Sequence, residues 1–555
     1  DAIRLMGNKA EAKRRMLDAK VPCVPGYEGA DQSDRALIAE GEKISAPLMV
    51  KAAAGGGGRG MRLVNDMAEL VNAIKLARAE AESAFGNGEL ILEKAIVRPR
   101  HVEVQVFADT QGNTIHLGER DCSVQRRHQK VVEEAPCPVM TDTLRAEMGA
   151  AAVAAAKSIH YRGAGTVEFL LDEKGTFYFL EMNTRLQVEH PVTELITGLD
   201  LVALQLQVAQ GEPLGLNQED ITLTGHAIEA RLYTEDPAQD FLPSSGSVDL
   251  WSPASGVGVR IDSGICTGQE ISPFYDPMVA KVIAHGPTRD IARLRLIEAL
   301  NATVLFGATH NSDFLVACLE KRCFAEGQAT TAFIAEEFAE GETSSPEPDF
   351  TDSAVAAALQ LSLEYEELYD RAVIVAPQLR NWASASPLIS RKKYTHSEVT
   401  THDLSVTPLG DKLYKVFNAD NEVSVELISM DGTTAHISID DMQHTVRYMT
   451  PRVGKIYLSM NGRANVYEDQ ILLDGQQNEV GGSGKVVAPM HGLLLEIRVS
   501  AGDKVASGQT LAVLEAMKMH YEIVADASGT VTEVLVKSNN QVAADDLLID
   551  IDTEA

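Results

Sequence analysis

The spacing of hydrophobic side chains changes along the chain, and each change marks a different kind of element. Apolar positions recur at helical spacing over residues 1–22, which predicts one helix. Residues 23–95 mix strand and helix patterns around a run of glycines, and residues 96–340 alternate strands with helices. An alanine-rich helix is predicted over 141–161, and Thr141 is placed to cap its N-terminus. The first part of the chain is therefore predicted to be an α/β region.

The pattern changes after this region. Around 340–350 the composition shifts to polar residues and proline, which predicts a linker, and a helical stretch follows at 353–375. Short alternating strands, separated by turns with Asp, Asn and Gly, run from about 390 to 470 and predict a small barrel. The Gly- and Ser-containing segment 478–484 is typical of a flexible tether.

The end of the chain contains an internal repeat. Residues 487–511 recur 37 positions later as residues 524–548, with matching glycine, glutamate, valine and leucine positions. Both copies show short alternating strands, and two such halves form a quasi-symmetric β-sandwich. The segment between the copies is then an exposed hairpin, with Lys518 of Glu-Ala-Met-Lys-Met near its tip. A lone surface lysine is usually a solvated charge, but this one is presented by a symmetric scaffold.

Composition narrows the possible functions. The 555 residues include 49 basic and 80 acidic side chains, and the net charge of −31 argues against non-specific binding to nucleic acid or anionic membranes. The apolar runs are too short to span a bilayer, and no signal peptide is visible. The six cysteines lack CxxC spacing, which indicates reduced thiols in a cytosol-like compartment.

Two stretches are candidates for holding a nucleotide. The loop Gly55–Gly58 follows an apolar strand, and its glycines let backbone N–H groups approach phosphate oxygens, while Lys51 adds a positive charge. The spacing is not that of a Walker A loop, so a plain flexible loop is an equal alternative. A second strand ends in Glu93-Lys94 followed by Ile96 and is placed to border an adenine, with Glu93 near its amino group. A routine strand end is the alternative there.

A pair of glutamates is a candidate metal site. Residues 166–183 predict a hairpin, and a two-residue Lys-Gly turn would place Glu168 directly opposite Glu181. Like charges in that position repel, and a divalent cation between them converts the repulsion into ligation. Oxygen ligands suit Mg²⁺ or Mn²⁺, and Asn183 lies on the same face as Glu181. The alternative is a solvent-facing pair that tolerates mild repulsion.

The segment after this hairpin combines a cation, an amide and a carboxylate. Arg185, Gln187 and Glu189 can together hold a small anion and supply a base beside it. Upstream, residues 101–105 alternate polar side chains onto one strand face, and residues 125–130 place polar side chains in a row. A surface charge run is the usual meaning of such a row, but beside a phosphate site it favours anion capture.

Together these motifs resemble a known family. Residues 1 to about 337 resemble the ATP-grasp biotin carboxylase component of biotin-dependent carboxylases, through KAAAGGGGRGM, ERDCSVQRRHQKVVEEAP, YRGAGTVEF and FLEMNTRLQVEHPVTE. The tail EAMKM resembles biotinyl carrier domains, and its paired Met residues favour biotin over lipoate. The strands at 390–470 are similar to the barrel-like domain between carboxylase and carrier. The implied fold is a multidomain α/β plus all-β chain: an ATP-grasp biotin carboxylase, a β-barrel-like middle domain and a biotinyl β-sandwich.

The resemblance implies roles for individual residues. Those expected around ATP are Lys9, Lys51, Gly55, Gly56, Gly57, Gly58, Glu93, Lys94, Ile96, His101, Gln125 and His128. Those expected to bind the metal ions are Glu168, Glu181 and Asn183. Those expected to hold bicarbonate are Lys130, Arg185, Gln187 and Val188. The expected catalytic residues are Lys130 and Arg185, Glu189 as the base that deprotonates bicarbonate, and Arg260, whose charge stabilises the biotin enolate. Lys518 is expected to carry the biotin.

The resemblance also implies domain boundaries. In chain order these are the end of the biotin carboxylase N-terminal subdomain (1–22), the ATP-grasp lid (23–95), the C-terminal subdomain (96–340), linker helices with a β-rich docking domain (341–480) and the carrier (481–555). The chain starts at Asp1 rather than Met, inside a helical pattern, and most of the first subdomain of the family is missing. We therefore expect an incomplete copy of a longer protein.

The implied reaction has two steps. Bicarbonate attacks the γ-phosphate of ATP to give carboxyphosphate, which breaks down to CO₂ beside the biotin on Lys518. A carboxyltransferase then uses the carried group; a TIM-barrel carboxyltransferase needs ~250 residues, so residues 340–480 cannot contain one. The implied partners are a separate carboxyltransferase β subunit, in an α6β6 hetero-oligomer, and a biotin protein ligase. The expected location is the bacterial cytoplasm or, in a eukaryote, the mitochondrial matrix.

The acyl-CoA substrate and the class of activity have alternatives. FGATHNSDFL and TTAFI look like the 3-methylcrotonyl-CoA and geranyl-CoA branch, and a propionyl-CoA or acetyl-CoA carboxylase is the alternative. Another ATP-grasp ligase, such as a carboxylate–amine ligase, is disfavoured by Lys518 and by RLQVEHP. A carrier scaffold with an inert ATP-grasp half is the remaining class.

Overall fold

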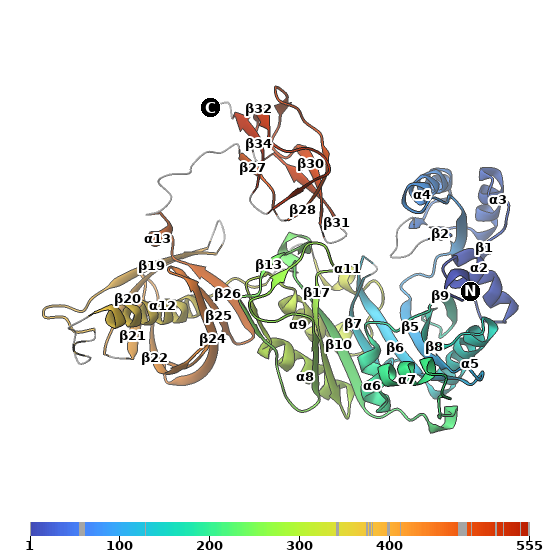
Figure 1. Ribbon diagram of the computed structural model, residues 1–555, viewed down its shortest axis with the longest axis horizontal. Helices are drawn as coiled ribbons and strands as arrows, with labels where there is room; N and C mark the ends of the chain where they lie inside the picture. Colours follow the sequence, from blue (N-terminus) through green and yellow to red (C-terminus); the bar gives the residue numbers. More distant parts are fainter. Residues whose placement is uncertain are drawn as a thin grey trace.

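The computed structural model describes most of the chain, which folds into an N-terminal α/β unit, a large sheet with helices, a barrel and a small β-sandwich (Figure 1). The described residues are 2–54, 61–127, 129–339, 343, 345–372, 376, 379, 381–396, 400–410, 412–474, 485–489, 491–516, 519–525, 527–543 and 546–552.

Two short helices open the described chain where the sequence predicted one. α1 (Ala2–Met6) is separated from α2 (Lys9–Asp18) by Asn8, whose side chain accepts a hydrogen bond from the Glu11 N–H at 3.0 Å. Asn competes with the helical backbone for hydrogen bonds and is favoured at an N-cap, so it starts a new helix here. Asn8 also forms a β-bridge with Ala54, which holds the start of α2 against the first small sheet.

This first sheet has the order β1-β4-β2-β3 and is covered by two helices. The elements are β1 (Gly26–Tyr27), α3 (Asp34–Ile44), β2 (Leu48–Ala52), β3 (Met61–Val64), α4 (Leu70–Phe85) and β4 (Leu90–Lys94). Val50 and Leu92 pack with Leu37 and Ile74 in the core between sheet and helices. Since successive strand residues point to opposite faces, Lys51 of β2 and Glu93 of β4 lie on the other face.

The large sheet is antiparallel, in the order β15-β17-β10-β7-β6-β5-β8-β9. Its strands are β5 (Arg100–Ala108), β6 (Thr114–Arg126), β7 (Gln129–Ala135), β8 (Gly163–Leu171), β9 (Phe177–Asn183), β10 (His226–Tyr233), β15 (Val259–Ser263) and β17 (Met278–Gly286). Its main helices are α5 (Asp142–Ser158), α6 (His190–Thr197), α7 (Leu201–Ala209), α8 (Arg289–Ala302) and α9 (Ser312–Glu320). Thr141 caps α5 as predicted, accepting a hydrogen bond from the Leu144 N–H at 3.2 Å.

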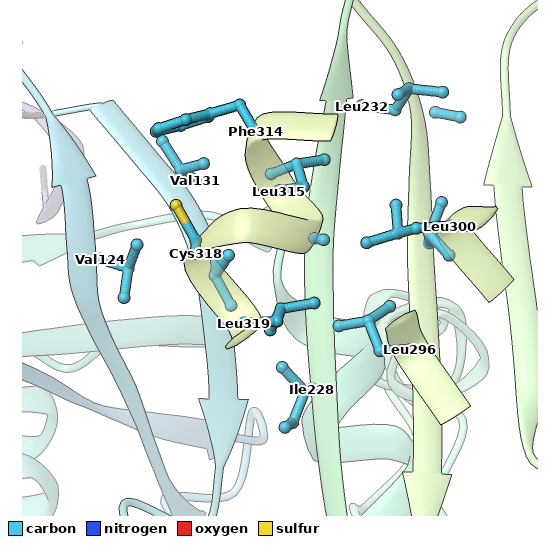
Figure 2. Close-up of a cluster of buried hydrophobic side chains, with 14 of the residues drawn as sticks. Val124, Val131, Ile228, Leu232, Leu296, Leu300, Phe314, Leu315, Cys318 and Leu319 are labelled. Carbon is cyan, nitrogen blue, oxygen red and sulfur yellow. The ribbon is translucent and has the colours of Figure 1, made fainter. Parts of the chain in front are cut away.

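Short elements complete this part of the chain. They are β11 (Glu235–Asp236), β12 (Leu242–Pro243), β13 (Gly246–Ser247), β14 (Leu250–Ser252), β16 (Glu270–Ile271), β18 (Val304–Phe306), α10 (Arg322–Ala325) and α11 (Phe333–Glu337). The largest apolar core lies between the sheet and helices α8 and α9. Figure 2 shows Leu296 of α8 and Phe314, Leu315 and Leu319 of α9 directed toward the strands, where Ile228 of β10 meets them.

The opposite half of the sheet has an apolar face and a polar face. Val102, Val104 and Val106 of β5 pack with α2 and α5 in a second core. The intervening side chains, among them His101 and Glu103, point to the other face. Helices α6 and α7 contact this part of the sheet and cover it, so the polar side chains are buried too.

The strands after the linker form a nearly closed barrel around a helix. One sheet contains β19 to β26 in chain order, and Tyr394 near its start forms a bridge to Asp469 just after its last strand. The strands are β19 (Ser390–Thr395), β20 (Thr401–Pro408), β21 (Leu413–Phe417), β22 (Glu422–Asp431), β23 (Thr434–Ile439), β24 (Met442–Arg452), β25 (Lys455–Met460) and β26 (Arg463–Glu468), followed by the short helix α13 (Gln470–Asp474). Helix α12 (Phe350–Arg371) had been expected to belong to the linker, but Ala354 to Leu359 are fully buried against the strands.

The C-terminal domain has two four-stranded sheets related by the internal repeat. The sheet orders are β27-β34-β32-β29 and β31-β30-β28-β33. The strands are β27 (Lys485–Val487), β28 (Gly492–Ile497), β29 (Lys504–Val505), β30 (Thr510–Ala516), β31 (Met519–Val524), β32 (Gly529–Val534), β33 (Asn540–Val542) and β34 (Leu547–Asp552). The pairing of β28 with β30 and β33 is repeated by β32 with β34 and β29, which confirms the predicted two-fold sandwich.

Within the described chain, no single helix is both long and apolar enough to cross a bilayer. Helices α6 and α7 meet the length and composition requirement only when taken together, and they meet at a bend of 97°.

Candidate active site

The predicted catalytic side chains meet on the polar face of the large sheet. His101 and Glu103 alternate on β5 as the sequence predicted; Glu168 lies on the adjacent strand β8, and Lys130 lies on β7, with β6 between it and β5. The segment that leads from β9 into α6 adds Glu189 to this face. All of these side chains are buried or nearly so, which makes their charge pairing decisive for the fold and for the chemistry.

Lys130 is at the centre of the site. Its Nζ atom donates hydrogen bonds to Glu103 Oε2 at 2.6 Å, Glu168 Oε1 at 3.1 Å and Glu189 Oε1 at 2.6 Å. Burial alone would lower the pKa of Lys130, but the surrounding carboxylates, Glu103 foremost, raise it well above its usual value. The ammonium group is therefore a fixed positive charge, placed where a small anion can approach Glu189.

Glu168 accepts hydrogen bonds from several side chains around the site. The donors are Lys130 Nζ, Asn183 Nδ2 at 2.8 Å and Gln187 Nε2 at 2.9 Å, and His101 Nε2 lies 2.9 Å from its Oε2 atom. Burial raises the pKa of Glu168, but Lys130 and His101 outweigh it and hold the pKa well below the ordinary value. These donors are far apart in the sequence, so the sequence analysis placed them in one site but did not predict which of them bonds Glu168.

Glu168 and Glu181 are Cα partners across β8 and β9, as the sequence predicted, but the turn is not the predicted one. The loop spans residues 172–176, because Leu171 pairs with Phe177 and the Asp172 N–H donates to the Thr176 carbonyl. A bulge between Glu168 and Phe169 restores the register that a two-residue turn would have given.

Glu181 is the carboxylate that lacks a donor. Among the residues that the structure describes, no hydrogen bond or salt bridge to the Glu181 side chain is present, although Lys9 interacts with it electrostatically. Burial, followed by the charge of Glu168, raises the pKa of Glu181. A hard divalent cation between Glu168 and Glu181 would remove this strain, so the two carboxylates and Asn183 fit such an ion.

Two other groups of potential ligands lie nearby. His101, Glu103 and Glu168 bring ligand atoms within 4.8 Å of one another, and so do Glu103, Cys122 and Glu189. Every carboxylate of these two groups accepts a hydrogen bond from Lys130, whereas the Glu168–Glu181 pair includes Glu181, which has no donor in the described part of the chain, so that pair fits an ion better.

Glu189 is held between two cations. Its Oε1 atom accepts from Lys130 at 2.6 Å, and its Oε2 atom accepts from Arg231 at 3.0 Å. Burial raises the pKa of Glu189, but Lys130, Arg231 and Arg120 together bring it below the ordinary value. Glu189 is therefore ionised at neutral pH, as a base requires.

Arg120 and Arg231 are site residues that the sequence analysis missed. Arg120 is fully buried, and its guanidinium donates to Glu103 Oε1 at 2.5 Å and to Gln105 and Thr193. Arg231 bonds both Glu189 and Glu133. Arg231 lies in β10 between Ala230 and Leu232, where an arginine is unexpected unless paired, and that pattern was the available signal. Arg120 lies between Glu119 and Asp121 and gave no such signal.

Arg260, expected to stabilise the biotin enolate, lies apart from the Lys130 cluster, and its enolate role stays a prediction. Its guanidinium is committed to Asp262 at 2.9 Å and to Glu194 of α6 at 2.7 Å. Among the described side chains it forms no hydrogen bond or salt bridge with Lys130, Glu168 or Glu189. Arg231 is the guanidinium on Glu189, since residue 231 lies on the central strand β10 whereas Arg260 lies on the edge strand β15.

The residues expected beside adenine form a buried ion cluster. Glu93 accepts from Lys51 at 2.6 Å and from Lys13 at 2.9 Å, and all three side chains are buried. Burial would raise the pKa of Glu93, but Lys51 and Lys13 lower it to about 2. The carboxylate thus has one ammonium partner on each oxygen, and its contact with an adenine amino group stays a prediction. Lys94 donates to the Ala46 and Ser45 carbonyls, and Ile96 is half-buried after β4.

A cavity of about 500 Å³ joins the N-terminal helices to the site. Its lining includes Lys9 at the start of α2 and Glu181, Asn183 and Arg185. Arg185 is exposed, and within the described part of the chain its guanidinium donates only to the adjacent Leu186 carbonyl, so it is open to an anion. Burial lowers the pKa of Lys9. The structure thus brings together residues that the sequence had placed in separate ATP, metal and bicarbonate groups.

The remaining predicted residues line the same region or lie outside the described chain. Gln125 Nε2 is 2.6 Å from His101 Nδ1, Gln187 contacts Glu168, and the Val188 carbonyl accepts from Lys281 at 3.0 Å. The predicted residues outside the described chain are Gly55, Gly56, Gly57, Gly58, His128 and Lys518.

Comparison with family models assigns the α/β region and the C-terminal domain of the chain. The family model Carbamoyl-phosphate synthase L chain, ATP binding domain, matches residues 8–217; Biotin carboxylase C-terminal domain matches 229–336; and Biotin-requiring enzyme matches 484–551. Among solved structures, the biotin carboxylase domain of the Hydrogenobacter thermophilus 2-oxoglutarate carboxylase, in complex with MgADP and bicarbonate, is 44% identical. The match covers 62% of this chain and 76% of that one, with a TM-score of 0.60.

Curated relatives match over nearly the whole chain. The mitochondrial methylcrotonoyl-CoA carboxylase subunit alpha of Mus musculus is 39% identical over 569 residues, covering 100% of this chain and 78% of the relative. The propionyl-CoA carboxylase alpha chain of Ruegeria pomeroyi is 37% identical over 585 residues, covering 99% and 84%. The fold and site define an ATP-dependent biotin carboxylase joined to a biotin carrier domain. The chain belongs to the family of biotin-dependent acyl-CoA carboxylase alpha subunits.

Proposed function

We propose that this chain carboxylates a biotin carried on its own Lys518, using ATP and bicarbonate, and delivers the carboxyl group to a separate carboxyltransferase β subunit. The observation that carries the proposal is the contact of Lys130 with Glu168 and Glu189 on one sheet face. In this contact one buried cation lies between the carboxylate that we propose as the base and the carboxylate that we propose as a metal ligand. A structural domain has no need of this arrangement, because buried charges cost stability unless each is paired.

Glu189 is the proposed base for bicarbonate. An anion that approaches Lys130 and the exposed Arg185 lies next to Glu189, which is ionised and takes the proton. Arg231 holds the other carboxylate oxygen and fixes the direction of the base. Transfer of the proton leaves bicarbonate doubly charged and more nucleophilic toward the γ-phosphate of ATP.

Glu168, Glu181 and Asn183 are proposed to hold the metal ion that accompanies ATP. Mg²⁺ or Mn²⁺ bound there supplies charge neutralisation on the transferring phosphoryl group. The chain's own residues orient that site: His101 and Gln187 fix Glu168. Lys9 and Lys51 are proposed to bind the phosphates.

Lys518 is the proposed attachment point for biotin, and a biotin protein ligase is the enzyme that would modify it. Support comes from the EAMKM motif and from the match of residues 484–551 to the Biotin-requiring enzyme model. Bound biotin supplies a nitrogen that accepts the carboxyl group.

The acyl-CoA substrate is proposed to be 3-methylcrotonyl-CoA or geranyl-CoA, on the segments FGATHNSDFL and TTAFI. Sequence identity does not rank the branches, because a relative named for methylcrotonoyl-CoA is 39% identical and one named for propionyl-CoA is 38% identical. Rates with 3-methylcrotonyl-, geranyl-, propionyl- and acetyl-CoA, measured on the chain purified with its native β subunit, decide the substrate.

Replacement of the base tests the core of this proposal. General bases contribute ~10²–10⁴-fold in rate, so Glu189→Gln should lower bicarbonate-dependent ADP formation by that order while ATP still binds. The exposed Glu212→Gln is a matched control and should keep the normal rate. Near-normal rates in the Glu189 variant would refute the assignment.

A further inference from the structure

Glu229 is a fully buried carboxylate without a partner. It lies on β10, and neither of its oxygens has a hydrogen-bond donor among the described residues. Its Cα partner on β7 is Glu133, which is also fully buried, and the Oε2 atom of Glu133 has no donor either. Two ionised carboxylates facing each other without donors would repel in a medium that cannot screen them.

One proton shared by Glu133 and Glu229 removes both the repulsion between the carboxylates and the lack of a hydrogen-bond donor. If one carboxyl group is protonated, its O–H can donate to the orphan oxygen of the other, and only one negative charge stays buried. The geometry shows which group keeps the charge. Glu133 Oε1 accepts from Arg231 Nε at 2.6 Å, so Glu133 has a cation to stabilise its ionised form, whereas Glu229 has no donor.

The charges around Glu229 agree with this assignment. The charged groups that act on Glu229 are Glu133 on β7, Lys281 on β17, Arg231 on β10 itself and Glu189, which immediately precedes α6. The elements packed against β10 also carry Lys130 on β7 and His190 and Glu194 on α6. Lys281 is engaged with the Val188 carbonyl and Asp262, Arg231 with Glu133 and Glu189, Glu194 with Arg260, and His190 with the Gln187 carbonyl. Burial first, and then Glu133, raises the pKa of Glu229 well above its ordinary value.

Glu133 links this pair to the catalytic base. Arg231 donates a hydrogen bond from Nε to Glu133 and another from Nη2 to Glu189, so its guanidinium lies between the two carboxylates. We infer that Glu229 is a positioning residue that keeps a proton at neutral pH and, by sharing it with Glu133, fixes Arg231 against Glu189. This inference rests on the proposed role of Glu189.

Two neutral variants with opposite expected results test it, measured in the biotinylated full-length chain with its β subunit. Glu229→Gln replaces a neutral carboxyl group by a neutral amide that can still donate to Glu133, so bicarbonate-dependent ADP formation near pH 7 should stay within about threefold. Glu133→Gln removes the charge that anchors Arg231 and should lower the rate about tenfold or more, as loss of a hydrogen bond to a charged group does. Equal losses in both variants, as a packing role predicts, would overturn the inference.

The pH profile gives a second measurement. In the native chain Glu229 loses its proton at alkaline pH, the two carboxylates repel, and the rate should fall; Glu229→Gln has no proton to lose, so this alkaline fall should be absent. Identical alkaline limbs in the two proteins would contradict the positioning role.

Infrared spectroscopy measures the proton without any activity. At pH 8.5 exposed carboxylates are ionised, so a band of a neutral carboxylic acid should be present in the native chain and should lose the intensity of one carboxyl group in Glu229→Gln. Absence of that band from the native chain would overturn the inference whatever Glu189 does. Conversely, a Glu189→Gln variant with normal rates would refute the proposed base and leave the proton assignment standing.

Discussion

Single buried charges decide much of the stability of the N-terminal α/β unit. Glu93 is bound by Lys13 and Lys51, and all three side chains are nearly inaccessible to solvent. Removing one member of such a cluster leaves uncompensated buried charge, which typically costs 3–5 kcal/mol. By contrast the exposed pair of Lys43 with Glu40, one turn apart on α3, contributes at most about 1 kcal/mol.

Glu93→Gln should therefore lower the stability at pH 7 by about 3 kcal/mol. The pKa of Glu93 in the folded protein, about 2, lies below the ordinary 4.5. The stabilisation is accordingly present above pH 4.5 and is lost as the pH falls toward 2. Thermal unfolding of native and variant proteins should show a Tm gap that is constant from pH 6 to pH 8 and narrows below about pH 5. Glu40→Gln should show almost no gap, and a Glu93 gap that widened in acid would contradict the assignment.

Residue types in local motifs could be predicted, but their distant partners could not. Glu168, Glu181 and Glu189 were found because each lies in a short polar pattern on a predicted strand or turn. Lys13 pairs with Glu93 across 80 residues, and Arg231 pairs with Glu189 across 42. Such pairings depend on the strand order of the sheets, which a single sequence does not reveal.

The β8–β9 hairpin brings Glu168 and Glu181, the proposed metal ligands, opposite each other. Glu181→Gln should raise the Mg²⁺ concentration needed for half-maximal ADP formation and lower turnover, because one of two facing carboxylates is lost. Folding should be preserved, since the neutral amide relieves repulsion with Glu168. Glu173→Gln, in the exposed loop of the same hairpin, is the control. An unchanged Mg²⁺ dependence in both Glu181→Gln and Glu168→Gln would exclude the metal role.

Helix α12 supplies the interior of the barrel, so the barrel should depend on it. Ala357 is fully buried between strands, and Ala357→Asp would place an unpaired carboxylate there at a cost of more than about 4 kcal/mol. Leu368→Asp changes an exposed residue of the same helix and should be tolerated. We expect the Ala357 variant to lose co-purification with the β subunit, while ATP cleavage with free biotin continues. Normal assembly of that variant would contradict a docking role for the barrel.

At the level of elements, hydrophobic periodicity predicted the strands of the barrel but not the helix that fills the barrel. Alternation found the barrel strands, but the helix from Phe350 was expected to be a connector, because its alanine-rich face has little amphipathic contrast. Similarly, helical spacing ran through Asn8, whose capping hydrogen bond splits the first helix. In the β8–β9 hairpin the bulge offsets the five-residue loop. The facing of Glu168 and Glu181 was therefore predicted correctly, although the predicted two-residue turn was wrong.

At the level of the whole molecule, the carrier must be loaded with biotin before it can link two reactions. Lys518→Arg keeps the positive charge but removes the amine that a biotin protein ligase would acylate. The variant should lose streptavidin binding and acyl-CoA carboxylation, while ATP cleavage with free biotin stays close to normal. Physical linkage raises the local concentration of biotin at the carboxylase site, so free biotin should be needed at far higher concentration than the attached form. Streptavidin binding by the variant would place the attachment elsewhere.

In the carrier domain, the strand that follows the EAMKM segment and the strand at which the chain enters from the barrel are two-fold counterparts. The pairing of Glu522 with Val513 in the β30–β31 hairpin, which contains Lys518 in sequence, has its two-fold counterpart in the pairing of Lys485 with Asp550. Unlike β30 and β31, the strands β27 and β34 are not consecutive in sequence, and β27 is the strand at which the chain enters from the barrel. The entry strand β27 and the strand β31 that follows the EAMKM segment belong to different sheets, so the link to the barrel and the biotinyl segment are held by separate layers of one sandwich.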